Sequence, residues 1–251
     1  MTKETKILEQ VKEKIDKEKT LSLTIKEGST TSVMSGISDS YITPYALSLN
    51  ANNAQIGLLS SFSGLVSPLS QLLGSRLMEK YSRRRIIITS VSLQALTWLP
   101  IIILGIFFLR NSFVSYLPIL LIAFYSLYAI LGAIAGPAWF SLMGDLVPEK
   151  IRGKYFGKRG KICGAIALVS TIIAGFVLDF FKTKGAVIIG FSILFLVACI
   201  VRLISAFLFK KHYYPKLKLE KGYYFSFIQF LKKSPKNNFG RFVIYIALMK
   251  F

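Results

Sequence analysis

Long stretches without a charged residue constrain this sequence more than any other feature. Residues 86–109 form 24 consecutive uncharged positions, and residues 111–144 form 34. An α-helix needs about 20 apolar residues to cross a hydrocarbon core about 30 Å thick. Charged residues make up only 18% of the chain, whereas soluble domains contain about 25%. The chain is therefore expected to lie in a lipid bilayer.

Six segments are long and apolar enough to be interpreted as membrane spans. They are residues 28–49, the segment from the turn at 50–53 to about residue 75, and residues 86–109, 116–143, 162–181 and 186–209. The first of these is unusually polar. We predict an all-α fold, a polytopic membrane helix bundle of six transmembrane helices over residues 28–209.

The segments outside these spans have their own character. Residues 1–27 are charged, with apolar residues four apart, which predicts an amphipathic N-terminal arm. Residues 210–238 form a basic loop, and residues 239–251 begin a seventh apolar segment. Thirteen helical residues span only about 20 Å, which is too short to cross a bilayer. We therefore expect an incomplete seventh helix, and a chain that is a fragment or a half-unit.

The distribution of basic residues predicts the orientation of the spans. If every span crosses, 27 Lys and Arg residues lie in the segments on one side and 3 on the other. Loops rich in Lys and Arg stay in the cytoplasm, so the N-terminus and the basic central loop are expected to be cytoplasmic, in a multi-pass protein of the cell membrane. The net charge of +20 is explained by these loops, and no nucleic-acid partner is expected.

The loop after the second span carries a recognisable motif. Residues 75–85 read SRLMEKYSRRR, and they resemble the signature loop G-x-L-A-D-R-x-G-R-R-R of the major facilitator superfamily. Leu77 and the three final arginines match, whereas Glu79 replaces the aspartate, and serines replace both glycines. The resemblance implies a secondary transporter whose full members have twelve spans in two halves. It also implies a lipid bilayer and a small-molecule substrate as partners, together with a C-terminal six-helix half.

A second stretch supports the same resemblance. Residues 144–159 read GDLVPEKIRGKYFGKR, and facilitators often carry an acid, a proline and an R-G pair at this place. In the family, such acids and arginines form a charge cluster that holds the inner gate. Carried over to this sequence, the cluster consists of Glu79, Arg83, Asp145 and Arg152. The alternative is that these side chains only reach the aqueous interface.

The first span contains a stripe of polar residues. Thr31, Ser35, Asp39 and Thr43 are four apart, which places them on one face of a helix. An acid inside a span is costly in lipid and normally faces a partner or a water-filled cavity. In facilitators, the first and fourth helices line the substrate pathway. Asp39, Ser35 and Thr43 are therefore candidates for substrate contact or ion coupling. The alternative for Asp39 is a structural hydrogen bond or ion pair.

Three further residues inside spans are candidates. Tyr125 and Tyr128 are three apart in the fourth span, so both could point into the pathway, or they could pack between helices. Arg202 is an intramembrane charge in the sixth span, seven residues from its end. It could extend to the inner surface, or it could pair with Asp39.

Enzyme classes find little support in the sequence. We find no metal-ligand cluster, no nucleophile–base pair and no cofactor fingerprint, so no enzymatic activity and no cofactor are expected. The sequence therefore predicts the N-terminal half of a facilitator-type secondary transporter that works by alternating access. The alternative is a membrane-embedded structural or assembly partner without transport of its own.

Overall fold

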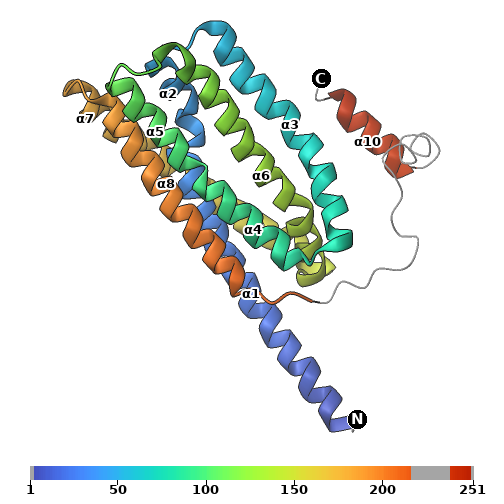
Figure 1. Cartoon of the computed structure of the whole chain (residues 1–251). Helices are drawn as coiled ribbons and strands as arrows, with labels where there is room; N and C mark the ends of the chain where they lie inside the picture. Colours follow the sequence, from blue (N-terminus) through green and yellow to red (C-terminus); the bar gives the residue numbers. More distant parts are fainter. Residues whose placement is uncertain (1–2, 216–237, 250–251) are drawn as a thin grey trace. The chain divides into compact units, whose positions relative to one another are not determined.

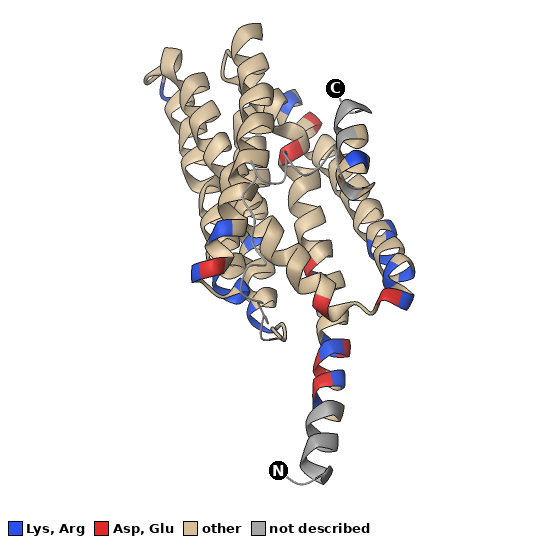
Figure 2. Cartoon of the chain, turned by 90° about the vertical axis from the view of Figure 1, so that its right-hand side faces the viewer, with Lys and Arg blue, Asp and Glu red and all other residues tan. Residues whose placement is uncertain are grey.

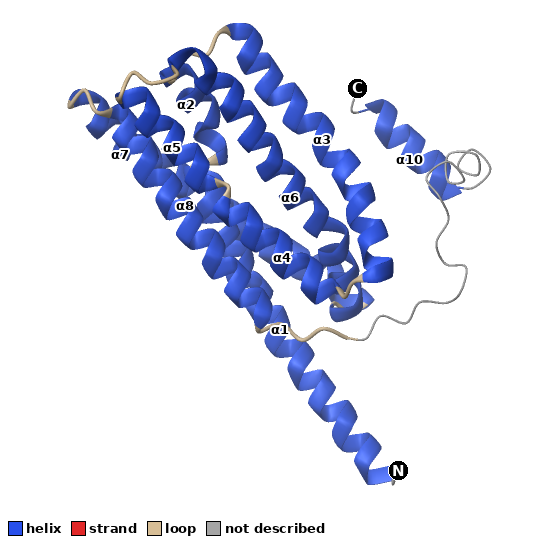
Figure 3. Cartoon of the chain, viewed as in Figure 1, coloured by secondary structure: helices blue, strands red, loops and turns tan. Residues whose placement is uncertain are grey.

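The computed structural model describes residues 3–215 and 238–249, and every regular element within these ranges is a helix (Figure 3). The chain divides into two units, Met1–Tyr214 and Pro215–Phe251. The longer helices of the first unit are α1 (Lys3–Ile37), α3 (Asn53–Lys80), α4 (Arg83–Leu96), α5 (Trp98–Leu109), α6 (Leu117–Leu146), α7 (Arg152–Thr183) and α8 (Val187–Lys210). An all-α polytopic bundle is therefore confirmed.

Five segments of the described residues are long and apolar enough to cross a membrane. They are Asn53–Lys80, Arg83–Leu109, Val114–Leu146, Glu149–Thr183 and Val187–Lys210. They correspond to the second through sixth expected spans, and most extend further than the apolar runs alone suggested. The extra turns carry the polar residues that flank each apolar run.

The first expected span, residues 28–49, is not one of these five and is not a single helix. Its first part belongs to α1, which ends at Ile37, and its second part is the short helix α2 (Ile42–Ser48). A 3-10 turn, η1 (Asp39–Tyr41), separates them. The Ser38 hydroxyl donates a hydrogen bond to the Met34 carbonyl oxygen at 2.6 Å, a local bond that competes with regular helix geometry.

The third expected span is also divided, into α4 and α5 around Thr97. Pro100 lacks a backbone N–H, so it cannot bond to the carbonyl of Leu96 four residues earlier. The Thr97 hydroxyl donates to the carbonyl of Gln94 at 2.6 Å. Helix α4 ends at Leu96 and α5 begins at Trp98, shortly after Gln94 in the sequence.

The helices of the first unit pack in an order different from that of the sequence. Helix α1 lies against α7 and α8, α4 lies against α6 and α8, and α3 lies against α6 (Figure 1). Gly74 permits a close crossing of α3 and α6, because any side chain at this position would collide with the backbone of Ile134. Trp98, Tyr45 and Phe195 are fully buried among the helices and form an aromatic core.

Basic residues gather at one end of the bundle, from which the N-terminal part of α1 extends (Figure 2). The connections between α3 and α4 and between α6 and α7 lie at this end, which we call the basic end. The α3–α4 connection is shorter than the loop expected at residues 75–85, because α3 continues to Lys80. Only Tyr81 and Ser82 lie between the helices, and the Ser82 hydroxyl accepts a hydrogen bond from the Arg85 amide.

The expected domain boundaries remain predictions. Helix α1 runs from Lys3 through residues 27 and 28 without interruption to Ile37, so the arm and only the first part of the first span form one helix. Most of the expected basic loop, residues 216–237, lies outside the described residues. In the second unit, α10 (Asn238–Met249) is a helix where the seventh apolar segment was expected.

Candidate functional site: a polar cavity and a buried charge network

A cavity of about 560 Å³ lies among the helices of the first unit and has an unusually polar lining. Helices α1, α3, α4, α6 and α8 and the turn η1 all contribute to it. The lining residues are Thr31, Met34, Ser35, Asp39, Ser60, Ser63, Gly64, Ser67, Gln71, Gln94, Tyr125, Tyr128, Ala129, Gly132, Ala133 and Arg202. Two of these side chains are ionisable acids or bases, Asp39 and Arg202, and both lie within the bundle.

The sequence-predicted residues are distributed unevenly around this cavity. Ser35, Asp39, Tyr125 and Tyr128 line it together with Arg202. Thr43 does not, because the 3-10 turn η1 lies between Asp39 and the helix α2 that contains Thr43, so the α-helical register does not continue to Thr43. The rings of Tyr125 and Tyr128 stack with centroids 5.4 Å apart and planes 14° apart. This stack forms one aromatic wall of the cavity.

Asp39 has an incompletely satisfied carboxylate. Its Oδ1 atom is buried and has no hydrogen-bond partner within the described part of the chain. Asp39 forms none of the ion pairs found there, so the alternative of a direct ion pair with Arg202 is not seen in this conformation. A buried acceptor without a donor is energetically costly, so this atom is suited to a proton, a cation or a donor group of a ligand.

Arg202 is 7% exposed and lies inside the bundle instead of extending to its surface. Its Nε and Nη2 atoms both donate to Gln94 Oε1, at 2.8 and 2.6 Å. Its Nη1 atom donates to the hydroxyl of Thr31 at 2.8 Å. Gln94 is itself fixed by donating to the Tyr128 carbonyl oxygen at 3.2 Å, and a side chain at Gly132 would collide with the Gln94 amide. The guanidinium is therefore held in one orientation.

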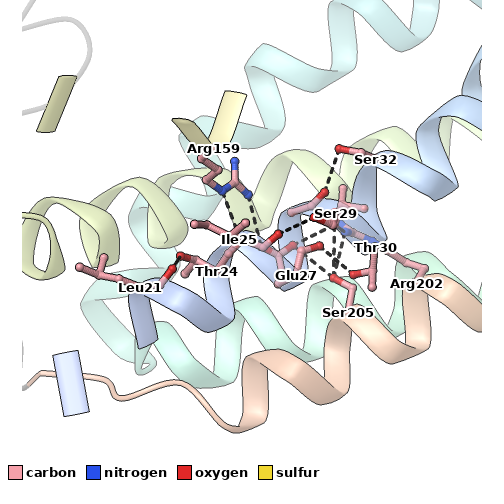
Figure 4. Close-up of polar contacts among 12 residues, drawn as sticks. Leu21, Thr24, Ile25, Glu27, Ser29, Thr30, Ser32, Arg159, Arg202 and Ser205 are labelled. Atoms are coloured by element: carbon pink, nitrogen blue, oxygen red, sulfur yellow. Dashed lines mark hydrogen bonds and ion pairs between the residues drawn. The ribbon is translucent and has the colours of Figure 1, made fainter. Parts of the chain in front are cut away.

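Glu27 balances this positive charge through hydroxyl groups. The side chain is 3% exposed, and its Oε1 atom accepts hydrogen bonds from Thr31 at 2.8 Å and from Ser205 at 3.2 Å (Figure 4). Thr31 and Ser205 also accept from Arg202, so two hydroxyls bridge the carboxylate and the guanidinium. The three elements of this network are α1, α4 and α8.

Arg159 is the second cation in contact with Glu27. Its Nη2 atom lies 3.4 Å from Glu27 Oε2, and its Nε atom donates to the Thr24 carbonyl oxygen at 3.3 Å. The guanidinium also lies over the ring of Trp139, 4.8 Å from its centroid. A smaller cavity of about 220 Å³ lies beside Glu27 and both arginines. It shares Thr31, Gly132 and Arg202 with the larger cavity.

The predicted inner-gate residues lie at the basic end. Arg83 Nη1 forms an ion pair with Asp145 Oδ2 at 2.6 Å and donates to the hydroxyl of Ser141 at 3.1 Å. Arg152 donates to the carbonyl oxygens of Gly144 and Val147, which stabilises the C-terminus of α6. Glu79 is exposed and forms none of the hydrogen bonds or ion pairs found among the described residues.

Sequence reasoning missed two parts of the site. Ser60, Ser63, Ser67 and Gln71 line the cavity at helical spacing along α3, and this polar stripe was a usable signal. Glu27 fell just outside the expected first span, and Arg159 was counted only as a loop charge. Their pairing depends on how α1 and α7 pack, which no local pattern encodes.

Comparison with known families decides the class of protein. A family model described as Major Facilitator Superfamily matches residues 29–249, which is most of the chain. The chain belongs to the major facilitator superfamily. The resemblance to this superfamily is thereby confirmed, and the facilitator is a multi-pass membrane transporter. Membership in a transporter family also fits the expectation that it is not an enzyme. No curated protein and no solved structure matches this facilitator chain.

Proposed function

We propose that this facilitator moves a small solute across the cell membrane by alternating access, and that the large polar cavity is its substrate pathway. One observation carries the proposal. The buried Asp39 Oδ1 atom has no partner among the described residues, and it lines a cavity of about 560 Å³ that also contains Arg202. Ionisable groups inside a membrane bundle usually mark substrate or ion pathways.

The pathway is expected to need a second set of helices. All lining residues of the cavity come from one bundle, α1 to α8. In secondary transporters, substrate sites lie between two structural repeats that rock against each other. We therefore propose that a C-terminal six-helix half supplies the opposite wall, and that the present bundle is the N-terminal half.

The basic end is proposed to face the cytoplasm and to carry the inner gate. The excess of Lys and Arg at this end supports the orientation. The Arg83–Asp145 ion pair joins the start of α4 to the end of α6, and Asp145 is 43% exposed. Arg83 is buried in this pair, so a conformational change that opens the pair must also hydrate Arg83 or give it a new partner. Glu79 precedes Arg83 by four residues in the sequence, and Arg152 follows Asp145 by seven.

A vesicle assay tests the proposed transport. Membrane vesicles from cells that express the gene should accumulate at least one class of labelled small solute, drawn from sugars, amino acids, organic acids and amines. Uptake should saturate with concentration and should be missing from vesicles of cells in which the gene is deleted. Identical uptake by both vesicle preparations across the panel would favour the structural-partner alternative.

A further inference from the structure

Three consecutive arginines at the start of α4 have three different environments. Arg83 is buried and pairs with Asp145. Arg84 donates from Nη2 to the carbonyl oxygen of Lys210 at 3.1 Å, at the C-terminus of α8. Arg85 is exposed, and its guanidinium lies 5.3 Å from the centroid of the Tyr81 ring. Arg83 and Arg84 therefore connect α4 to neighbouring helices, whereas the side chain of Arg85 lies at the exposed surface.

The guanidinium of Arg85 has unused hydrogen-bond donors. Within residues 3–215 and 238–249, it makes no hydrogen bond and no ion pair, and it lies over the Tyr81 ring. A guanidinium carries five N–H donors in a planar fork that matches the oxygens of a phosphate group. Arg85 is thus available to bind an anion.

Arg85 lines a cavity of about 220 Å³ at the junction of α3 and α4. The cavity lining also contains Leu77, Tyr81, Ile86, Thr89 and Ser90. Hydroxyls in membrane helices commonly bond to their own backbone, as Thr97 does here. Thr89 and Ser90 make no such bond within the described part of the chain, so two further donors face the same space.

The position of this cavity indicates the depth at which a ligand would lie. Arg85 and Thr89 belong to the first two turns of the span Arg83–Leu109, where the apolar run begins. The hydrocarbon core gives way to phospholipid headgroups at such a place. The lining combines one cation and two hydroxyls with the aliphatic side chains of Leu77 and Ile86. This mixture suits a ligand that has an anionic group joined to an apolar one.

We propose that the α3–α4 cavity binds an anionic phospholipid of the leaflet at the basic end. The phosphate group accepts hydrogen bonds from Arg85, Thr89 and Ser90, and the glycerol and upper acyl carbons pack against Leu77 and Ile86. A charge-assisted hydrogen bond to phosphate is stronger than diffuse attraction to a charged surface. Inorganic phosphate would use the cation but would leave the aliphatic side unfilled. The site is separate from the proposed substrate pathway, with which it shares no lining residue.

The test measures phosphatidylglycerol bound to the purified chain by native mass spectrometry, with phosphatidylcholine as the uncharged comparison. Arg85→Gln should lower the affinity for phosphatidylglycerol by about tenfold or more. Thr89→Phe, which fills the cavity and keeps the charge, should lower it by a similar factor. Lys80→Gln removes a nearby exposed charge outside the cavity, and it should have an effect below about twofold at an ionic strength near 0.3 M, where exposed charges are screened.

Two results would overturn the proposal. Equal losses in Arg85→Gln and Lys80→Gln, with Thr89→Phe unchanged, would show only diffuse attraction of the basic end to anionic lipid. Displacement of phosphatidylglycerol by millimolar inorganic phosphate would show a site for free anions. All three variants must elute as a single species and keep the helix content of the parent chain. Because substrate uptake is not measured, failure here leaves the proposed transport untouched.

Discussion

Replacing Glu27 with leucine is expected to destabilise the bundle by roughly 3–5 kcal/mol, because the substitution leaves two buried or half-buried arginines without their acid. Arg159 would lose its ion pair, and Thr31 and Ser205 would lose the carboxylate to which they donate, so Arg202 would lose the acid that these hydroxyls bridge to it. Reversible unfolding in mixed detergent micelles, followed by circular dichroism, measures the change.

The controls separate this network from a general effect of removing an acid. Glu79→Leu removes an exposed acid that has no partner among the described residues, and it should change the stability by less than about 0.5 kcal/mol. Adding Arg159→Met to Glu27→Leu removes one unpaired cation and should restore part of the lost stability. A Glu27→Leu variant as stable as Glu79→Leu would refute the network.

Replacing Asp39 with asparagine is expected to reduce saturable uptake about tenfold or more in the vesicle assay. Asparagine keeps the shape of the side chain but removes the charge that a bound proton, cation or donor group would compensate, and a hydrogen bond to a charged group contributes about 1.5–3 kcal/mol. The residual uptake should also lose any dependence on pH that the parent shows.

Ser40→Ala is the matched control for this variant. Ser40 is the next residue in the same turn, is exposed and does not line the cavity, so its loss should leave uptake unchanged. The proposed role of Asp39 would be rejected if Asp39→Asn and Ser40→Ala both retained the parent rate and the parent pH profile. The structural alternative, a hydrogen bond inside the bundle, would then be preferred.

The spans were predictable because a helix must be long and apolar to cross a bilayer. Such a helix is visible in the local sequence as a long apolar run. Residues 86–109 illustrate both the strength and the limit of this signal. The whole segment crosses as predicted, but hydropathy gave no sign of the break at Thr97. The break depends on a single missing N–H at Pro100, which an average over twenty residues hides.

The candidate site was predictable only for residues close together in the sequence. Ser35 near the end of α1 and Asp39 in the turn η1 both line the cavity, as their spacing predicted, whereas Thr43 in α2 does not. Ser205 is three residues from Arg202 on α8, but the other partners could not be predicted, because Gln94 belongs to α4 and Thr31 to α1. Their meeting depends on the rotation and depth at which α1, α4 and α8 pack.

The central claim is that the cavity lined by α3 serines is a water-filled pathway, and accessibility of Ser63 tests it most directly. In a background with Cys163→Ala and Cys199→Ala, which removes both native cysteines, Ser63→Cys is compared with Leu65→Cys on the same helix. Leu65 is 66% exposed on the bundle surface and does not line the cavity. A thiol reacts as the thiolate, which requires water.

A membrane-impermeant maleimide, added to intact cells and separately to inside-out vesicles, reports on both faces. We expect Ser63→Cys to react in both preparations and Leu65→Cys to react in neither, because the first faces the pathway and the second faces lipid. An unreactive Ser63→Cys in both preparations, or a Leu65→Cys that reacts equally well, would contradict the assignment of this cavity as the route of the transported solute.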